Sequence, residues 1–173
     1  MKMEGDSLIK FIEDIRQTWG PLSSEMVEKT QAMLERLVRA PISEPWLAAL
    51  QGDFRESCEL YRDPTHGFVL LVHLEREETY RHPHDHGDGW VIYAVQRGEM
   101  EMGTYACIEK ENGEKIVRRE KVRLKAGESR VYLPGDIHDT RCVSSSVLMF
   151  RLTSCDLKAE QQAIRVKRYA EEK

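Results

Sequence analysis

The chain has 173 residues, of which 40% are hydrophobic and 32% charged, and this composition is typical of one soluble domain. Its formal net charge of -4 gives none of the basic excess that nucleic-acid-binding proteins usually carry. No apolar run approaches the roughly 18 residues needed to cross a membrane, and the charged N-terminal segment lacks a signal-peptide core, so we expect a cytoplasmic protein.

The first fifty residues have the periodicity of helices. Apolar residues recur at helical spacing over 7–19 and over 24–40, which predicts a helix in each segment. A short third helix is predicted over 44–50, with Ser43 as its N-cap.

After residue 53 the chain changes to short β-branched and aromatic runs separated by turn residues. Asn112 and Gly113 fit a tight hairpin turn between two of these runs, and the tail 159–173 is ambiguous between helix and strand. Strands are predicted over 67–75, 89–96, 99–109, 115–124, 129–133 and 146–152. Many short strands at regular spacing predict a sandwich or barrel, here with a helical N-terminal cap.

Three of the six histidines lie in the stretch RHPHDHGDGW. Alternate side chains of a strand point to the same face, so His84 and His86 can chelate one ion from positions about 6.5–7 Å apart. His82 has the same parity, but Pro83 interrupts regular pairing, which favours a surface position. Taken alone, the HxH pattern also fits a polar loop without a metal. The four cysteines form no CxxC pair, so a thiolate zinc site is not expected.

Two stretches resemble the sequence motifs of the cupin family. The first motif reads HxH, three or four residues, Glu, six residues, Gly; here it starts at His84, has Val91 in the glutamate position and ends at Gly98. The second reads Gly, five residues, Pro-x-Gly, two residues, His; here it runs from Gly127 to His138. Both motifs occur in the family's order.

The resemblance covers roughly residues 54–155 and implies a mainly β cupin fold, which is a double-stranded β-helix or jelly-roll barrel. We therefore expect a single cupin domain over 1–173, with helices in 1–52 and the barrel in 53–173.

The metal site that the resemblance implies consists of His84, His86 and His138. It lacks the family's usual glutamate ligand, and Cys142 replaces the asparagine that usually follows the third histidine. Three neutral imidazoles leave three open positions on an octahedral ion, which suits ferrous iron binding both a substrate and dioxygen. Zinc, nickel, copper and manganese are the alternatives.

Within the cupins, a three-histidine site without the glutamate resembles the thiol dioxygenases of the cysteine dioxygenase group, bacterial members in particular. The stretches LYRDPTHGFVLLVHL, HPHDHGDGW and LPGDIHDT carry this resemblance. It implies an iron-dependent enzyme that adds both atoms of O2 to a small thiol, such as cysteine, to give a sulfinate. The expected partners are the thiol and O2, in a monomer or homodimer that binds neither nucleic acid nor membrane.

Three further residues are candidates for the substrate site. Family members hold the substrate carboxylate with an arginine on an early strand, and Arg62 matches it best; a surface ion pair with Asp63 or a neighbour is the alternative. The family's Ser-x-His-x-Tyr triad is absent from the last strand, where Arg151 could bind an anionic substrate, pair with a protein acid or point outward. Tyr93, expected on the inward face of Val91, could partly replace the missing tyrosine, or be an ordinary barrel aromatic.

Two neighbours of these positions are candidates for supporting roles. Trp90 could line the pocket or pack outside the barrel. Asp139 could orient a group beside His138 or form a salt bridge with Arg141.

Two other functions stay open at this stage. A three-histidine cupin could cleave a diketone or another carbon–carbon bond, which predicts an apolar pocket without an inward arginine. It could also be a sensor that binds a metal or small molecule and consumes no oxygen.

Overall fold

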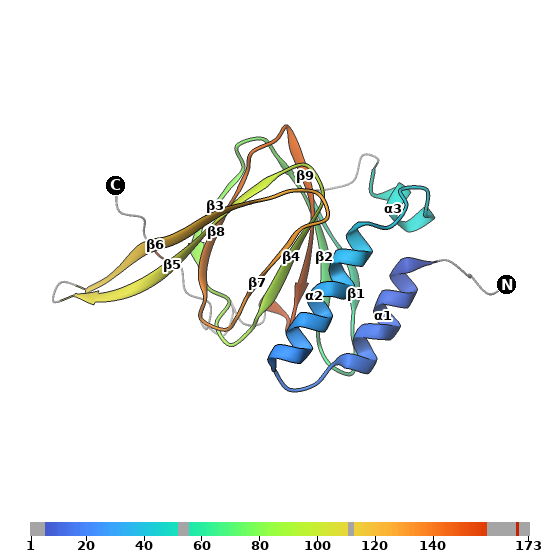
Figure 1. Cartoon of the computed structure of the whole chain (residues 1–173), viewed down its shortest axis with the longest axis horizontal. Coiled ribbons are helices and arrows are strands. Elements are labelled where there is room, and N and C mark those ends of the chain that lie inside the picture. Colours follow the sequence, from blue (N-terminus) through green and yellow to red (C-terminus); the bar gives the residue numbers. More distant parts are fainter. Residues whose placement is uncertain (1–5, 52–55, 111–112, 159–168, 170–173) are drawn as a thin grey trace.

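The computed structural model describes residues 6–51, 56–110, 113–158 and 169. Within these residues the chain forms three helices and then nine strands, and the helices lie together on one side of a barrel (Figure 1). The helices are α1 (Ser7–Thr18), α2 (Ser24–Val38) and α3 (Pro45–Ala49). The strands are β1 (Ser57–Arg62), β2 (Val69–Arg76), β3 (Tyr80–His84), β4 (Val91–Arg97), β5 (Met100–Lys110), β6 (Gly113–Leu124), β7 (Ser129–Tyr132), β8 (Ile137–Cys142) and β9 (Ser146–Thr153). None of the described helices is both long and apolar enough to pass through a bilayer.

The three predicted helices are confirmed, but the predicted cap of α3 is wrong. The N-cap of α3 is Glu44 rather than Ser43, and it makes no side-chain hydrogen bond to the helix. Its carboxylate oxygen Oε2 instead accepts hydrogen bonds from the backbone and hydroxyl of Ser7 and from the indole of Trp46. The side chain that could have capped α3 therefore ties it to the start of α1.

All six predicted strand segments are confirmed, with ends that differ by at most two residues. Strands β1, β3 and β8 lie outside those segments, and their sequences SCELYR, YRHPH and IHDTRC mix charged, polar and apolar residues. Asn112 of the predicted hairpin turn and nearly all of the tail 159–173 lie outside the described residues. The predicted class, a β-barrel with N-terminal helices, is confirmed.

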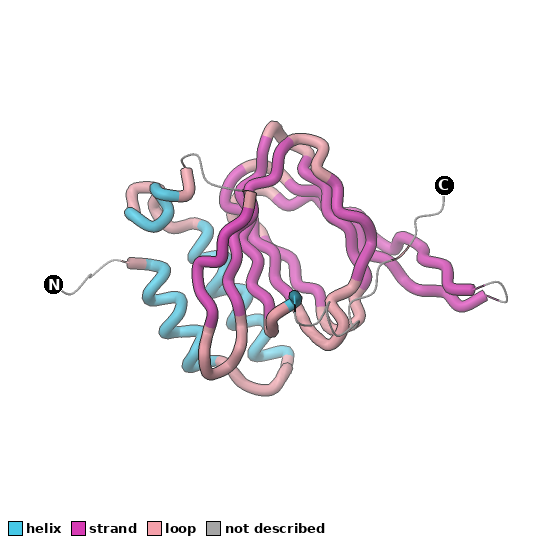
Figure 2. The backbone as a smooth tube through the Cα atoms, turned by 180° about the vertical axis from the view of Figure 1, so that it is seen from behind, coloured by secondary structure: helices cyan, strands magenta, loops and turns pink. Residues whose placement is uncertain are grey.

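The strands form two antiparallel sheets, in the orders β1-β2-β9-β4-β7 and β3-β8-β5-β6, around a common interior (Figure 2). The interior is lined by Val91, Tyr93, Val95, Met100, Met102, Leu124, Tyr132, Cys142, Val147 and Met149. The alternate residues of β2, β4 and β9 face the helices and form a second apolar cluster with them. The central strands β2, β9 and β4 of the five-stranded sheet are therefore largely buried on both faces. Strands β5 and β6 extend away from the barrel as a long hairpin (Figure 1).

Asp63, just after β1, connects the helical cap to the barrel. Its side chain is 1% exposed and pairs with Arg16 of α1 at 3.0 Å. It also accepts hydrogen bonds from the Tyr61 hydroxyl and from the backbone N–H groups of Thr65 and His66. Burial raises the pKa of Asp63, but the hydrogen bonds and the Arg16 charge outweigh it and hold this pKa below its usual value.

Asp63→Asn is expected to lower the free energy of unfolding by about 1.5–3 kcal/mol at neutral pH, because a hydrogen-bonded buried charge is lost. Because the pKa of Asp63 is lower in the folded state than in the unfolded state, its carboxylate stabilises the fold at pH values above the unfolded pKa of about 3.9. This stabilisation is lost as the pH falls through the folded-state pKa. The difference between the two proteins should therefore be full above about pH 5 and shrink in acid. Urea denaturation across this pH range measures it, and a pH-independent difference would contradict the assignment.

Candidate metal centre

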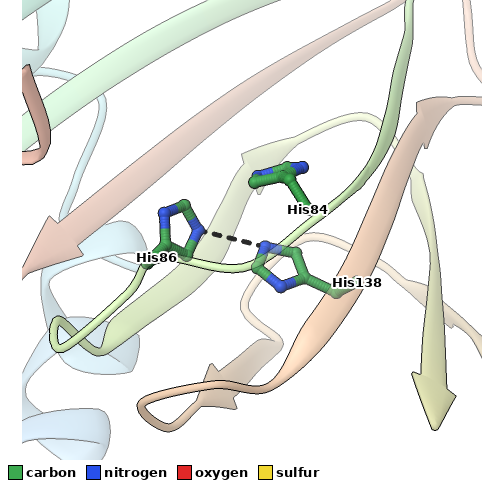
Figure 3. Close-up of side chains that lie close together, drawn as sticks. All are labelled: His84, His86 and His138. Carbon is green, nitrogen blue, oxygen red and sulfur yellow. Dashed lines mark hydrogen bonds between the residues drawn. The ribbon is translucent and has the colours of Figure 1, made fainter. Parts of the chain in front are cut away.

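Three histidines from two separate segments meet at one end of the barrel interior. His84 ends β3, His86 follows in the next turn, and His138 lies on β8 directly opposite His84 in the sheet register. Their potential ligand nitrogens all lie within 4.8 Å of one another. Figure 3 shows the three rings facing a common point. The pairing of β3 with β8 thus brings together the histidines of both sequence motifs.

The spacing of the ring nitrogens fits a shared metal ion. Nε2 of His86 lies 3.2 Å from Nε2 of His138. Nitrogens bound to one ion at 2.0–2.1 Å stand roughly 3 Å apart, so this separation suits two neighbouring ligands. Nδ1 of His84 donates a hydrogen bond to the carbonyl of His82 at 2.7 Å, which places the lone pair of this third ring on Nε2.

Burial keeps two of these rings neutral. His138 is fully buried and His86 is 5% exposed. Burial, followed by the charges of His84 and Arg151, lowers the pKa of His86 to about 3. Burial and the two other histidines hold the pKa of His138 well below its usual value. A neutral imidazole is the form that binds a metal, so both rings are ready ligands at neutral pH.

The two sheets, closed around an interior with the histidines of both motifs at one end, decide the fold. The chain has a cupin fold.

No family model and no curated protein sequence matches it. Solved structures similar to the chain include the cupin domain of Schizosaccharomyces pombe Cnp3, at 10% identity, with 64% of this chain and 72% of that one covered and a TM-score of 0.46. KdgF from a Halomonas species is similar at 16% identity, with coverage of 60% and 86% and a TM-score of 0.48. A cupin superfamily protein from Desulfitobacterium hafniense is similar at 15% identity, with coverage of 67% and 94% and a TM-score of 0.47.

The position of the usual cupin glutamate is apolar in this barrel. Val91 fills it and is fully buried in the interior cluster. Among the described residues, the group that could hold a metal contains histidines only. Cys142, in the position of the usual asparagine, is also buried, with its sulfur 3.2 Å from the carbonyl of Ser144. The site therefore offers a metal ion three imidazole nitrogens, from His84, His86 and His138, and no carboxylate from the described part of the chain.

Tyr93 points into the barrel, as its parity with Val91 predicts. Its hydroxyl lies 3.2 Å from Nε2 of His86 and 3.2 Å from Nε2 of His138. Burial raises the pKa of Tyr93, and the nearby charge of Arg151 only partly opposes this. The phenol is therefore protonated at neutral pH and holds a hydrogen-bond donor beside two of the three histidines.

Sequence reasoning missed Tyr132, the last residue of β7. Its ring stacks on His138 with 3.9 Å between centroids and 12° between planes, and thereby helps to fix that ring. Its strand was predicted, and its position opposite Val91 in the register puts it on the inward face. That pairing, however, could not be read from the sequence.

Arg151 contributes a positive charge to the inner wall. On β9 it is the register partner of Tyr93, and it shares the inward face of Met149. Its Nε atom is buried and has no hydrogen-bond partner among the described residues. No carboxylate of the described part of the chain lies within ion-pair distance of it.

Arg62, by contrast, is an exposed residue that already has two carboxylate partners. It forms hydrogen-bonded ion pairs with Glu59 at 2.7 Å and with Asp156 at 2.8 Å. The surface ion pair, the alternative to substrate binding, therefore describes its geometry, with Glu59 and Asp156 as partners in place of Asp63. The structure does not bring Arg62 to the histidines.

Trp90 and Asp139 both point away from the histidines. Trp90 packs against the helices, where it stacks on Trp19 with 5.5 Å between ring centroids. Asp139, the neighbour of inward His138, is on the outer face of its sheet. There it accepts hydrogen bonds from the Gly103 N–H at 2.7 Å and from the hydroxyls of Tyr105 and Tyr80 at 2.6 and 2.9 Å. Asp139 therefore has neither of the two roles considered for it: it does not orient a group beside His138, and it forms no salt bridge with Arg141.

Asp139→Asn is therefore expected to weaken the fold and leave the metal site intact. Loss of a charged acceptor for three donors should lower the free energy of unfolding by about 1–3 kcal/mol. Urea denaturation of the metal-free protein and a zinc titration together separate the two effects. A tenfold loss of zinc affinity without a loss of stability would contradict the outer-face position of Asp139.

Proposed function

We propose that this cupin is a non-haem iron dioxygenase that oxidises a small thiol, cysteine or a similar compound, to a sulfinate. The observation that carries the proposal is a group of three histidines, two of them buried, with no carboxylate among them. Three neutral ligands leave half of an octahedral ion's positions open, which is enough for two reactants. The reaction is RSH + O2 giving RSO2H, in which sulfur loses four electrons and the two oxygen atoms gain them.

Each residue of the site has a defined part in this proposal. His84, His86 and His138 would hold the metal, which supplies the redox chemistry that joins O2 to the thiol. Tyr93 holds a hydroxyl donor at a fixed place beside His86 and His138, where it can hydrogen-bond to a reactant. The apolar interior around it, including Val91 and Met149, limits access of water to the reactants.

The two alternative functions, carbon–carbon bond cleavage and a sensor, make different predictions from this proposal. The first concerns the residues of the inner wall, and the second concerns oxygen consumption. Cleavage of a carbon–carbon bond in a diketone predicts an apolar pocket with no inward arginine, and Arg151 with its buried Nε argues against it. A sensor would bind metal and ligand and consume no oxygen.

Oxygen uptake tests the proposal. Metal-free protein is loaded with ferrous iron under anaerobic conditions and then supplied with O2 and cysteine, cysteamine or 3-mercaptopropionate. Oxygen consumption that matches sulfinate formation is the expected result. Stoichiometric iron binding with no uptake for any of these thiols would contradict a thiol dioxygenase and favour either a non-thiol substrate or a sensor.

A further inference from the structure

A positive charge that no described carboxylate neutralises lies on the inner wall of the barrel. Arg151 faces the interior from β9, its Nε is buried, and no described carboxylate pairs with it. Among the described residues, the buried acid of the same wall is Glu75 on β2, and Oε1 of Glu75 is already paired with Arg81 at 2.7 Å. A guanidinium whose Nε is desolvated and that has no described carboxylate beside it is in an unfavourable environment, so this arrangement is suited to an anion from outside the chain.

His73 adds an unused polar atom to the same place. His73 lies on β2 opposite Met149, and it is two residues after Leu71, the β2 residue that pairs with Arg151. It therefore shares the inward face of β2 with Leu71. Its Nε2 is buried, and no group in the described part of the chain hydrogen-bonds to it. Burial, with the charges of Arg151 and Arg81, lowers the pKa of His73 to about 3, so its ring is neutral and can donate one N–H.

This wall is next to the candidate metal centre. Arg151 and Tyr93 are register partners on neighbouring strands, whose Cα atoms stand about 4.5–5.5 Å apart. The Tyr93 hydroxyl in turn touches His86 and His138. A short molecule can therefore reach from the guanidinium of Arg151 to the histidines.

We propose that Arg151, with His73 and Tyr93 beside it, forms a subsite for the carboxylate of a short organic acid. A guanidinium binds a carboxylate through two parallel hydrogen bonds, which fixes both the position and the direction of the acid. The subsite itself needs only a carboxylate; that the acid also carries a thiol rests on the proposed function. It follows that carboxylated thiols are preferred over cysteamine, which brings a second positive charge to an already positive wall.

Binding without turnover tests the subsite. Zinc-loaded protein is titrated calorimetrically with propionate and with 3-mercaptopropionate, and Arg151→Gln is compared with the parent. We expect Arg151→Gln to weaken both acids at least about tenfold, Arg151→Lys to weaken them less, and ethanethiol to bind equally to all three proteins. Arg62→Gln, which removes an exposed arginine, is the matched control and should leave both affinities unchanged.

The stability of the variants gives a second, independent measurement. Because no described carboxylate pairs with Arg151, Arg151→Gln should melt at the same temperature as the parent or higher, and propionate should raise the melting temperature of the parent alone. Equal propionate affinity in folded, zinc-loaded parent and Arg151→Gln protein would overturn the subsite, as would no propionate binding by the parent. Either result leaves the oxygen-uptake test untouched, and a failed uptake test leaves the propionate result standing.

Discussion

His86→Ala is expected to abolish stoichiometric metal binding. His86 supplies a neutral, buried Nε2 that faces His138 at 3.2 Å, and the two remaining histidines cannot make a three-coordinate site. Loss of residues that only support a metal ligand costs roughly 10–100-fold in affinity, so loss of a ligand should cost about 100-fold or more. Titration of metal-free protein with zinc and with ferrous iron measures the change.

His82→Ala is the matched control for this experiment. His82 lies two residues before His84 in the same segment, but its side chain is exposed and packs against the ring of Tyr80. Its carbonyl, which accepts the hydrogen bond from His84, survives the substitution. Metal affinity should therefore stay at the parent value. Equal affinity losses in His82→Ala and His86→Ala would show that the metal binds elsewhere in the histidine-rich segment.

Tyr93→Phe is expected to lower kcat about 100-fold, the usual cost of removing one well-placed donor from an active site. The substitution removes the hydroxyl that lies 3.2 Å from both His86 and His138 and keeps the ring. Metal affinity should stay within about threefold, because the histidines keep their places. Steady-state oxygen uptake, with the bound iron quantified in each sample, separates the two effects.

Tyr132→Phe provides the comparison for Tyr93→Phe. It removes a buried hydroxyl that makes no hydrogen bond to the described residues, and it keeps the ring that stacks on His138. Its effect on kcat should be much smaller than that of Tyr93→Phe. Equal losses in both variants would mean that general packing around His138, and no specific donor, explains the result.

The spacing of sequence motifs and the alternation of strands predicted much of this site. The two motifs gave His84, His86 and His138, whose ring nitrogens do come together, and parity with Val91 put Tyr93 on the inward face. The same parity rule argues against roles for two other candidates. Trp90 precedes inward Val91 and Asp139 follows inward His138, so both face outward.

Other features depend on strand pairing, which a single sequence does not specify. His73 has the parity of an inward residue in β2, but only the pairing of β2 with β9 brings it near Arg151. Arg62 has acids on both sides of it in the chain, and its partner Asp156 is 94 residues away. A long side chain on an edge strand can reach several acids, so its choice of partner follows from the fold.

The origin of the product's oxygen atoms tests the central claim most directly. Iron-loaded protein is given 3-mercaptopropionate under ¹⁸O2 in unlabelled water, and the sulfinate is analysed by mass spectrometry. We predict that both sulfinate oxygens carry the label, that the product forms in step with oxygen consumption, and that His86→Ala forms none. Sulfinate with an oxygen from water, or equal product from His86→Ala, would contradict dioxygenation at the three histidines.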